Sequence, residues 1–388
     1  MFCNSLCVKA PIARIKRNSL FSEERLPLKT ARWRFYAREF AGCSTYVGST
    51  PRQFDSSAAY EEQMAAVRAK PYYQIIDGVP RCPLALPDAL RRALSFVAKK
   101  GDLLQVSFPK SGTHWVQYIT QLILNEGEPV STYEDFTRGA MFIEYREDAM
   151  DYTASTPVRT LCTHLLLRRE TLNPEAKYVY VARNPWDVCV SLYHHVKDLS
   201  SYRFDGTFDD FLEAFLAGDL PYGDYFEHVM AGYSLREQPN VLFITYEELM
   251  RDKRGGVMRL AHFIGERYGK MLGEDSEESR KRLELILERS TAESMRSVMV
   301  LNLSDHPDPL LDKRLKDLSI SSKAAYGGDP KRHNFVRKAK VGGWKEHFSP
   351  EQLRRLEATI AEKTQESEVM NLWSDIRQEA LHLCAPQD

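Results

Sequence analysis

Residues 103–124 read LLQVSFPKSGTHWVQYITQLIL, and they carry the most specific structural pattern in the chain. Its first six residues form a short apolar run that predicts a buried strand, the next four predict a turn, and residues 113–125 predict a helix. A helix N-terminus offers unpaired N–H groups and the positive end of the helix dipole, which bind anions. Because Lys110, Ser111, Gly112 and Thr113 stand at that junction, we expect an anion-binding loop. The alternative is that Ser and Gly only cap the helix.

The loop differs from the G-x-x-x-x-G-K-[ST] loop of nucleotide kinases. Lys110 precedes Gly112, and the first glycine of that pattern is missing. A nucleotide kinase stays an alternative that this difference disfavours.

On both sides of this segment, apolar runs alternate with amphipathic stretches, which is typical of β-α units around a parallel sheet. Further strands are expected at 158–163, 178–182 and 241–245. Helices are expected at 185–197, 258–265 and 278–289, and a last helix begins at Ser349 with a capping box. Residues 324–343 are expected to form a long loop. The prediction is an α/β fold, a single domain over 70–388 with a mostly parallel central sheet flanked by helices and a P-loop-like nucleotide site.

Composition limits the function classes. The chain has 388 residues, of which 43% are hydrophobic, and this composition excludes a collagen-like or wholly disordered chain. Its net charge of −1 gives no indication of a nucleic-acid partner. No apolar window is long enough to span a membrane. The seven cysteines are scattered without a C-x-x-C pair, so we expect neither a disulfide framework nor a metal site. We expect a cytoplasmic location, because free cysteines are typical of a reducing compartment.

The charge is distributed unevenly. Residues 1–54 hold ten basic and three acidic residues, a net of +7, which leaves −8 for the remainder. An Arg-rich, acid-poor leader is typical of mitochondrial transit peptides. The alternatives are a disordered or lineage-specific extension, or a start codon placed too far upstream. We expect residues 1–69 to be an extension that the domain over 70–388 does not need.

Two further segments carry basic residues. Arg183 ends the strand in YVYVARNPWDVCVSLYHH, and Ser191 follows about two helical turns later. An Arg at the carboxyl end of a parallel strand faces the ligand crevice and can grip a phosphate, although it could instead pair with Asp187. In FVRKAKVGGWKEHF, Arg337 and Lys338 crowd a glycine-containing loop. Beside a phosphate crevice this run would supply a second anion clamp.

Together these segments resemble the cytosolic sulfotransferase family over residues 72–348. The family's 5′-phosphosulfate loop is similar to PKSGTHW at 109–115, its 3′-phosphate segment to RNPWDVCVS at 183–191, and its C-terminal signature to RKAKVGGWK at 337–345. The resemblance implies transfer of a sulfuryl group from 3′-phosphoadenosine 5′-phosphosulfate to a small phenol, steroid, alcohol or amine, with no metal. It places the catalytic histidine at His164, in the THL of residues 163–165.

The resemblance also implies a role for each matching residue. His164 is the general base, Lys110 stabilises the leaving group, and Ser191 is a further catalytic candidate. The residues implied in donor binding are Lys110, Ser111, Gly112, Thr113, His114, Trp115, Arg183, Ser191, Tyr246, Ser290, Thr291, Met295, Arg337, Lys338 and Ala339.

The chain departs from the family pattern at several positions. Cys162 stands where a lysine is usual, Ala339 where a glycine is usual, and Ala292 where an aromatic residue is usual. If residue 339 needs a positive φ, an alanine there weakens donor binding. These departures favour the alternative of a nucleotide-binding protein with reduced or lost catalysis. The family's dimerisation motif is degenerate after Lys345, with Arg354 in place of an acid, so a homodimer is an expectation in doubt.

The acceptor pocket is expected to come from loops at residues 135–152 and 200–225. Their aromatic residues suggest a flat apolar acceptor, although such residues also pack loops onto cores. They are Phe136, Phe142, Tyr145, Tyr152, Tyr202 and Phe204. Phe108, beside the anion-binding loop, is a further candidate for the wall of the pocket.

Overall fold

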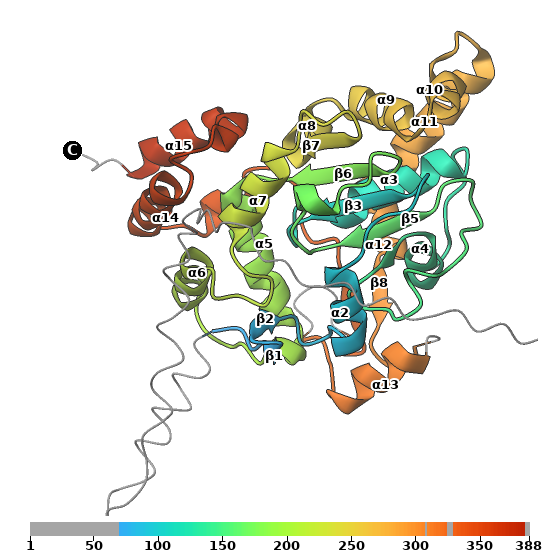
Figure 1. Cartoon of the computed structure of the whole chain (residues 1–388). Coiled ribbons are helices and arrows are strands. Elements are labelled where there is room, and N and C mark those ends of the chain that lie inside the picture. Colours follow the sequence, from blue (N-terminus) through green and yellow to red (C-terminus); the bar gives the residue numbers. More distant parts are fainter. Residues whose placement is uncertain (1–69, 307–308, 324–328, 385–388) are drawn as a thin grey trace, which may run out of the picture. The chain divides into compact units, whose positions relative to one another are not determined.

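The structure is a computed structural model that describes residues 70–306, 309–323 and 329–384. These residues form one α/β domain built around a parallel sheet (Figure 1). The predictions for the basic leader, including mitochondrial targeting, lie outside the described residues.

The central sheet has five parallel strands in the order β4-β5-β3-β6-β7. Its members are β3 (Leu103–Ser107), β4 (Met141–Phe142), β5 (Thr160–Thr163), β6 (Lys177–Ala182) and β7 (Val241–Thr245). The four strands predicted from the sequence are confirmed. The edge strand β4 was not predicted, because two residues are too short for any periodic pattern.

Helices surround this sheet, and two small antiparallel pairs lie outside it. The pairs are β1 (Gln74–Ile76) with β2 (Val79–Arg81), and β8 (Val300–Asn302) with β9 (Arg332–Asn334). The helices are α2 (Pro87–Leu94), α3 (Thr113–Leu124), α4 (Tyr133–Gly139), α5 (Pro185–Asp198), α6 (Phe208–Ala217), α7 (Tyr225–Ser234), α8 (Tyr246–Arg251), α9 (Lys253–Ile264), α10 (Glu266–Gly273), α11 (Glu277–Arg289), α12 (Ala292–Val298), α13 (Pro309–Asp317), α14 (Pro350–Lys363) and α15 (Ser374–Cys384). None of the described helices is long and apolar enough to cross a membrane.

Local sequence explains where the central elements begin. Every residue of β3 is buried, as expected for a strand covered on both faces. Asn184 caps α5 by accepting a hydrogen bond from the N–H of Asp187, and Pro185 takes the first helical position. Ser349 and Gln352 form the predicted capping box of α14. These signals fix the starts of α5 and α14.

Two sequence predictions were wrong. Residues 324–343 are not one loop, because β9 forms within them and pairs with β8; residues 324–328 lie outside the described part. The helix after Ser349 is also not the last, since α15 follows it. Basic residues hid the strand, whose one buried position is His333.

The order of the strands places the site. The chain adds β4 and β5 on one side of β3 and then β6 and β7 on the other, so the order reverses between β3 and β6. Ligands of open parallel sheets bind where the order reverses, at the carboxyl ends of the strands. Figure 1 shows β3, β5 and β6 side by side at the centre, with α9 to α11 on one side and α13 on the opposite side.

Buried tryptophans fix the C-terminal segments against this core. Trp344 is fully buried beside Trp186 of α5, with ring centroids 6.2 Å apart. Trp373 donates from its indole nitrogen to Glu247 at 2.7 Å, and the same carboxylate accepts from Asn184. Trp344, the tryptophan of the C-terminal motif, therefore anchors that segment in the core.

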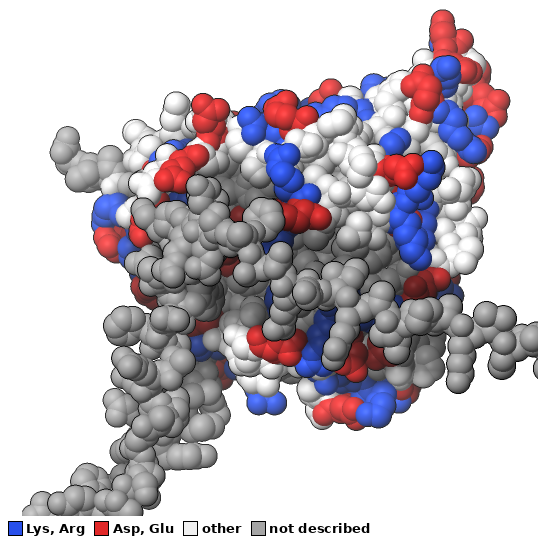
Figure 2. Space-filling model, viewed as in Figure 1, with Lys and Arg blue, Asp and Glu red and all other residues white. Residues whose placement is uncertain are grey.

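Figure 2 shows acidic and basic side chains interspersed over the described part of one face, which gives that face no single charge sign.

Candidate functional site

A cavity of about 530 Å³ opens at the carboxyl ends of the central strands. It brings together all but one of the predicted site residues: Lys110, Gly112, Thr113, His114, Trp115, His164, Arg183, Ser191, Tyr246, Ser290, Thr291, Met295, Arg337, Lys338 and Ala339. The exception is Ser111, whose buried hydroxyl does not line the cavity and has no hydrogen-bond partner in the described residues. These residues come from segments up to 229 positions apart in the sequence, from Lys110 to Ala339.

The loop between β3 and α3 has the backbone of an anion cradle. Gly112 has φ +101° and precedes a helix whose N-terminus receives no side-chain cap. A Cβ at Gly112 would lie 2.8 Å from Cδ2 of Tyr246, so only glycine fits. Lys110 also has a positive φ, +70°, which is strained for a lysine. The free N–H groups at the start of α3 are thus open to a ligand.

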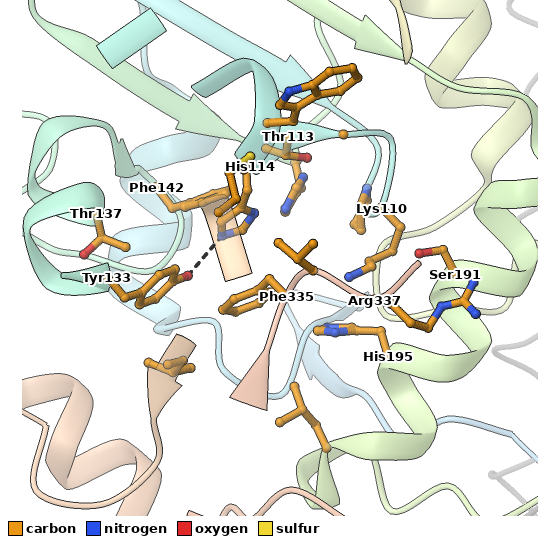
Figure 3. A pocket seen from close by; sticks show the side chains of 18 of the residues that line it. Lys110, Thr113, His114, Tyr133, Thr137, Phe142, Ser191, His195, Phe335 and Arg337 are labelled. Atoms are coloured by element: carbon orange, nitrogen blue, oxygen red, sulfur yellow. Dashed lines mark hydrogen bonds between the residues drawn. The ribbon is translucent and has the colours of Figure 1, made fainter. Parts of the chain in front are cut away.

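Lys110 is the charge at the centre of the cavity. Figure 3 shows its side chain extending between Ser191 and Phe335, with Arg337 beside it. Its nitrogen lies 5.9 Å from the centroid of the Phe335 ring. Burial, followed by repulsion from Arg337 and Arg183, lowers the pKa of Lys110 to about 8. An anionic ligand would relieve this repulsion and raise the pKa again.

His164 directly follows β5, and one of its ring nitrogens is engaged in a hydrogen bond. Its Nδ1 lies 2.8 Å from the carbonyl oxygen of Ser107. A carbonyl only accepts, so Nδ1 carries the proton and Nε2 keeps a lone pair. Burial lowers the pKa of His164 to about 4, partly offset by the bond to Ser107. The imidazole is therefore neutral at pH 7 and able to accept a proton.

A buried carboxylate supports the backbone of that histidine. Glu144 accepts the N–H of His164 at 2.7 Å, and burial raises the pKa of Glu144 to about 7. The ring of His164 packs against Phe142 at 4.9 Å and meets Tyr222 edge-on at 5.8 Å. Nothing in the sequence pattern indicated Glu144, because a lone acidic residue before a loop carries no signal.

Arg183 lies at the end of β6 and is held on several sides. It donates to the carbonyl oxygen of Lys340 at 2.9 Å, forms an ion pair with Asp187 at 3.5 Å, and lies 4.3 Å from the ring centroid of Tyr246. The predicted ion pair with Asp187 is present, and Arg183 also lines the cavity, while its grip on a phosphate stays a prediction. Its Nε is buried without a partner among the described residues. An anion on this side would meet a fixed guanidinium.

The basic segment after β9 lines the cavity next to Arg183. Arg337 and Lys338 line the cavity, while Lys338 and Lys340 both pair with Glu346. These two hydrogen bonds lower the pKa of Glu346 to about 2. Ala339 has φ +50°, so the position that is usually glycine does adopt the left-handed conformation here. This is the condition under which the alanine was expected to weaken donor binding.

Two aromatic side chains, Trp115 and Tyr246, line one part of the cavity. Trp115 and Tyr246 meet edge-on at 5.1 Å, and the Trp115 indole nitrogen donates to the carbonyl oxygen of Ser290 at 2.8 Å. Thr291 caps α12, which begins at Ala292. The loop after α11 is thereby tied to the first turn of α3.

Another part of the cavity is lined by apolar and aromatic side chains. Of the predicted aromatic residues, Phe142, Tyr145 and Tyr202 line the cavity, whereas Phe136, Tyr152 and Phe204 do not. The Phe108 prediction was wrong: it is buried and packs edge-on against Tyr225 at 5.3 Å. Tyr222, in the predicted loop 200–225, also lines the cavity. Lining residues that the sequence did not indicate include Cys82, Leu84, Leu199, Leu301 and Leu311. They come from segments whose meeting depends on the tertiary fold.

The motif implied His114 in donor binding but did not predict the surroundings of its ring. Its ring stacks on Phe335 at 4.5 Å, and its Nε2 lies 3.1 Å from the hydroxyl of Tyr133 (Figure 3). Burial, followed by repulsion from Lys110, lowers the pKa of His114 to about 3.

Cys162, at the position where the resemblance implies a lysine, is buried in β5 and does not line the cavity. It therefore supplies no positive charge to the site. Within the described ranges, no group of three or more His, Cys, Asp or Glu residues is arranged to hold a metal ion.

The residues of the degenerate dimerisation motif are engaged within the chain. Lys345 pairs with Glu379 of α15, and Arg354 pairs with Glu351 at 2.6 Å. The expectation of a homodimer stays untested.

Known proteins share parts of this sequence and this fold. The model of the sulfotransferase domain family matches residues 100–368. Mouse (Mus musculus) sulfotransferase 2B1 is 33% identical over 68% of this chain and 71% of its own length, and bovine (Bos taurus) sulfotransferase 1A1 is 31% identical over 76% and 94%. The crystal structure of mouse sulfotransferase SULT7A1 complexed with PAP is similar in fold, with a TM-score of 0.56, 24% identity, and coverage of 79% of this chain and 99% of that one.

Proposed function

Because the chain belongs to the sulfotransferase family, we propose that it transfers the sulfuryl group of 3′-phosphoadenosine 5′-phosphosulfate to a hydroxyl or amine of a small acceptor. One observation carries this proposal. His164, whose Nε2 keeps a lone pair, lines the same cavity as Lys110 and the start of α3. A proton acceptor, a cation and an anion cradle thus share one space.

The donor would occupy the anion-binding side of the cavity. The N–H groups at the start of α3 would hold the 5′-phosphate, with Lys110 beside the bridging oxygen. Arg183, Ser191 and Arg337 would hold the 3′-phosphate. Trp115 and Tyr246 would enclose the adenine. The 3′-phosphate contacts would distinguish this donor from ordinary adenine nucleotides.

The chain's own residues would then divide the work of transfer. His164 would take the proton of the acceptor through Nε2 as the new bond to sulfur forms. Lys110 would stabilise negative charge on the oxygen that leaves sulfur and stays on the 5′-phosphate of adenosine 3′,5′-bisphosphate. Sulfuryl transfer, like phosphoryl transfer, mainly needs position and charge stabilisation. No step in this scheme uses a metal.

The acceptor would be a small phenol, steroid, alcohol or amine with an apolar body. The wall beside His164 is formed by Phe142 and Tyr222, and further out by Leu84, Leu301 and Leu311. A site of this kind binds apolar surface and uses a few polar groups for orientation.

A second candidate is a nucleotide-binding protein that has lost catalysis. It is favoured by Ala339 in the left-handed conformation and by the buried thiol of Cys162, where the family usually has a lysine. The first feature would weaken the donor site, and the second leaves one fewer cation near the transferring group.

The test uses the full chain, labelled donor and a panel of phenols, steroids, alcohols and amines. Transfer to at least one acceptor that disappears in His164→Ala supports the enzyme. Tight binding of adenosine 3′,5′-bisphosphate without transfer to any acceptor supports the binding protein instead. A preference for ATP over the 3′-phosphorylated donor contradicts both.

A further inference from the structure

Residues 335–341, called here the clamp segment, carry Arg337, Lys338 and Ala339 along one wall of the cavity. The segment is separated from the phosphate loop by more than 200 positions in the sequence. Its basic side chains can contact a ligand in the cavity only if its backbone is held at a fixed distance from β3 and α5.

The C-terminal end of the clamp segment is held by a carboxylate in the first turn of α5. Asp187 accepts the N–H of Gly342 at 2.9 Å and the N–H of Trp344 at 3.1 Å. Its side chain is almost fully buried, at 2% exposure. A buried carboxylate that receives two backbone N–H groups fixes both the distance and the direction of the chain at this point.

The N-terminal end is held by a carboxylate in the last turn of the same helix. Asp198 Oδ2 lies 2.6 Å from Nδ1 of His333, which is in β9, two residues before the clamp segment. Both side chains are 1% exposed. Asp198 also accepts from the hydroxyl of Ser322 at 2.9 and 3.0 Å.

Asp187 and Asp198 therefore hold the two ends of the clamp segment from the two ends of one helix, α5. A buried carboxylate is costly unless it is paired and hydrogen-bonded, so His333 cannot leave Asp198 without a large penalty. The β8 strand and the bond from Phe335 N–H to the Met299 carbonyl hold the segment to α12. Two buried contacts join the β9 end to α5: the Asp198–His333 pair, which is the hydrogen-bonded one, and the ring of His195, which meets that of His333 at 5.2 Å.

The position of His333 is transmitted to the reacting groups through Phe335. The two rings are perpendicular with centroids 4.7 Å apart, and Phe335 stacks on His114 at 4.5 Å. Figure 3 shows Phe335 beside the side chain of Lys110, with Arg337 on the other side of that lysine. A shift of β9 would move the aromatic ring and the guanidinium together.

We propose that Asp198 and His333 are positioning residues for the donor: their buried pair fixes the β9 end of the clamp segment on α5, so that Arg337 meets the 3′-phosphate. This inference rests on the proposed function. Helix α5 then carries two carboxylate anchors, one at each end, with Ser191 of the cavity wall between them.

The test measures the dissociation constants of two probes, adenosine 3′,5′-bisphosphate and adenosine 5′-monophosphate, by calorimetry with the full chain. Their ratio reports the 3′-phosphate contacts, because both probes share the adenine and the 5′-phosphate. The double variant Asp198→Asn/His333→Phe removes the pair without leaving a buried charge. We expect the bisphosphate to bind about tenfold more weakly and the monophosphate to bind within about twofold of the parent.

Two single variants complete the design. Asp198→Asn keeps the volume and loses the charge, so we expect a smaller loss, about threefold, in the preference for the bisphosphate; it decides the question if the double variant does not fold. Asp102→Asn is the matched control. Asp102 is another buried carboxylate, paired with Arg159 at 2.5 Å, and it does not line the cavity, so its loss lowers stability and leaves the ratio unchanged.

The outcomes separate this inference from the function it rests on. A parent protein that binds the two probes equally would overturn the proposed donor itself. A parent with a clear preference, retained in folded Asp198→Asn or in the double variant, would overturn only the positioning role. Equal weakening of both probes would also overturn it, because that result reports general damage to the cavity.

Discussion

The ring nitrogen Nδ1 of His164 lies 2.8 Å from the carbonyl oxygen of Ser107, the last residue of β3. The strand that leads into the anion-binding loop thus also sets the tautomer of the histidine at the end of β5. One backbone carbonyl links the group that would accept a proton to the loop that would hold the donor. The relative position of the two is fixed by the parallel pairing of β3 with β5.

Replacing His164 tests its role as a base. In His164→Ala we expect turnover to fall by about 10²–10⁴, since that is the usual contribution of general base catalysis. Affinity for adenosine 3′,5′-bisphosphate should stay within about twofold, because no donor contact is removed. The measurement is steady-state transfer combined with calorimetry. His164→Gln is the control for volume; full activity in either variant would remove His164 from the mechanism.

The pH profile should have two limbs. His164 has a pKa lowered to about 4 and must be neutral, so kcat/KM should rise as the pH passes about 4. Lys110 has a pKa lowered to about 8 and must be protonated, so kcat/KM should fall as the pH passes about 8. Bound donor raises the pKa of Lys110, which moves the alkaline limb of kcat to higher pH.

Lys110→Arg checks the assignment of the alkaline limb. A guanidinium stays charged over this range, so any residual activity should no longer fall near pH 8. An alkaline limb that persists in Lys110→Arg would assign the titration to another group.

The phosphate loop was the part of the site that sequence reasoning predicted best. A strand, turn and helix follow each other within 22 residues there, so local pattern alone places Lys110 and Gly112. The buried partners were out of reach. Glu144 and the Asp198–His333 pair act through tertiary contacts between residues 20 and 135 positions apart, and no local pattern encodes such pairs. The sequence around His333 also predicted a loop, because β9 has a single buried position and its partner β8 is remote in the sequence.

Glycine at position 339 should stabilise the protein. Ala339 has φ +50°, and the left-handed conformation costs an L residue about 1–2 kcal/mol. Glycine removes that strain but costs about 0.4–1 kcal/mol through the greater freedom of the unfolded chain. We therefore expect Ala339→Gly to raise the free energy of unfolding by about 0.5–1 kcal/mol. Chemical denaturation measures it.

The control for this variant is Ala358→Gly. Ala358 is exposed within α14, where glycine should lower the free energy of unfolding by about 0.5–1 kcal/mol. If both variants destabilise the protein equally, Ala339 is not strained. Tighter binding of adenosine 3′,5′-bisphosphate by Ala339→Gly would further show that the alanine weakens the donor site.

Alanine at position 112 should damage the anion-binding loop. Its Cβ would meet Cδ2 of Tyr246 at 2.8 Å, at a residue with φ +101°. We expect binding of adenosine 3′,5′-bisphosphate to weaken at least tenfold, roughly the effect of 1.4 kcal/mol. Gly101→Ala is the matched control, since Gly101 also has a positive φ, +82°, but has nothing within 4 Å of an added Cβ. Equal nucleotide affinities in the two variants would contradict a specific role for Gly112.

The carboxyl group of Glu144 should make stability depend on pH. Burial raises its pKa from 4.5 to about 7 in the folded protein, so the folded state holds the proton more tightly than the unfolded chain. Its contribution to stability is therefore full below about pH 4.5 and is lost as the pH rises toward about 7. Glu144→Gln stays neutral at every pH and keeps an oxygen for the N–H of His164. We expect it to be more stable than the parent at pH 8 by roughly 2–3 kcal/mol, and no more stable at pH 4. Denaturant unfolding at both pH values measures the difference, and a gain of equal size at pH 4 would show that Glu144 does not titrate in this range.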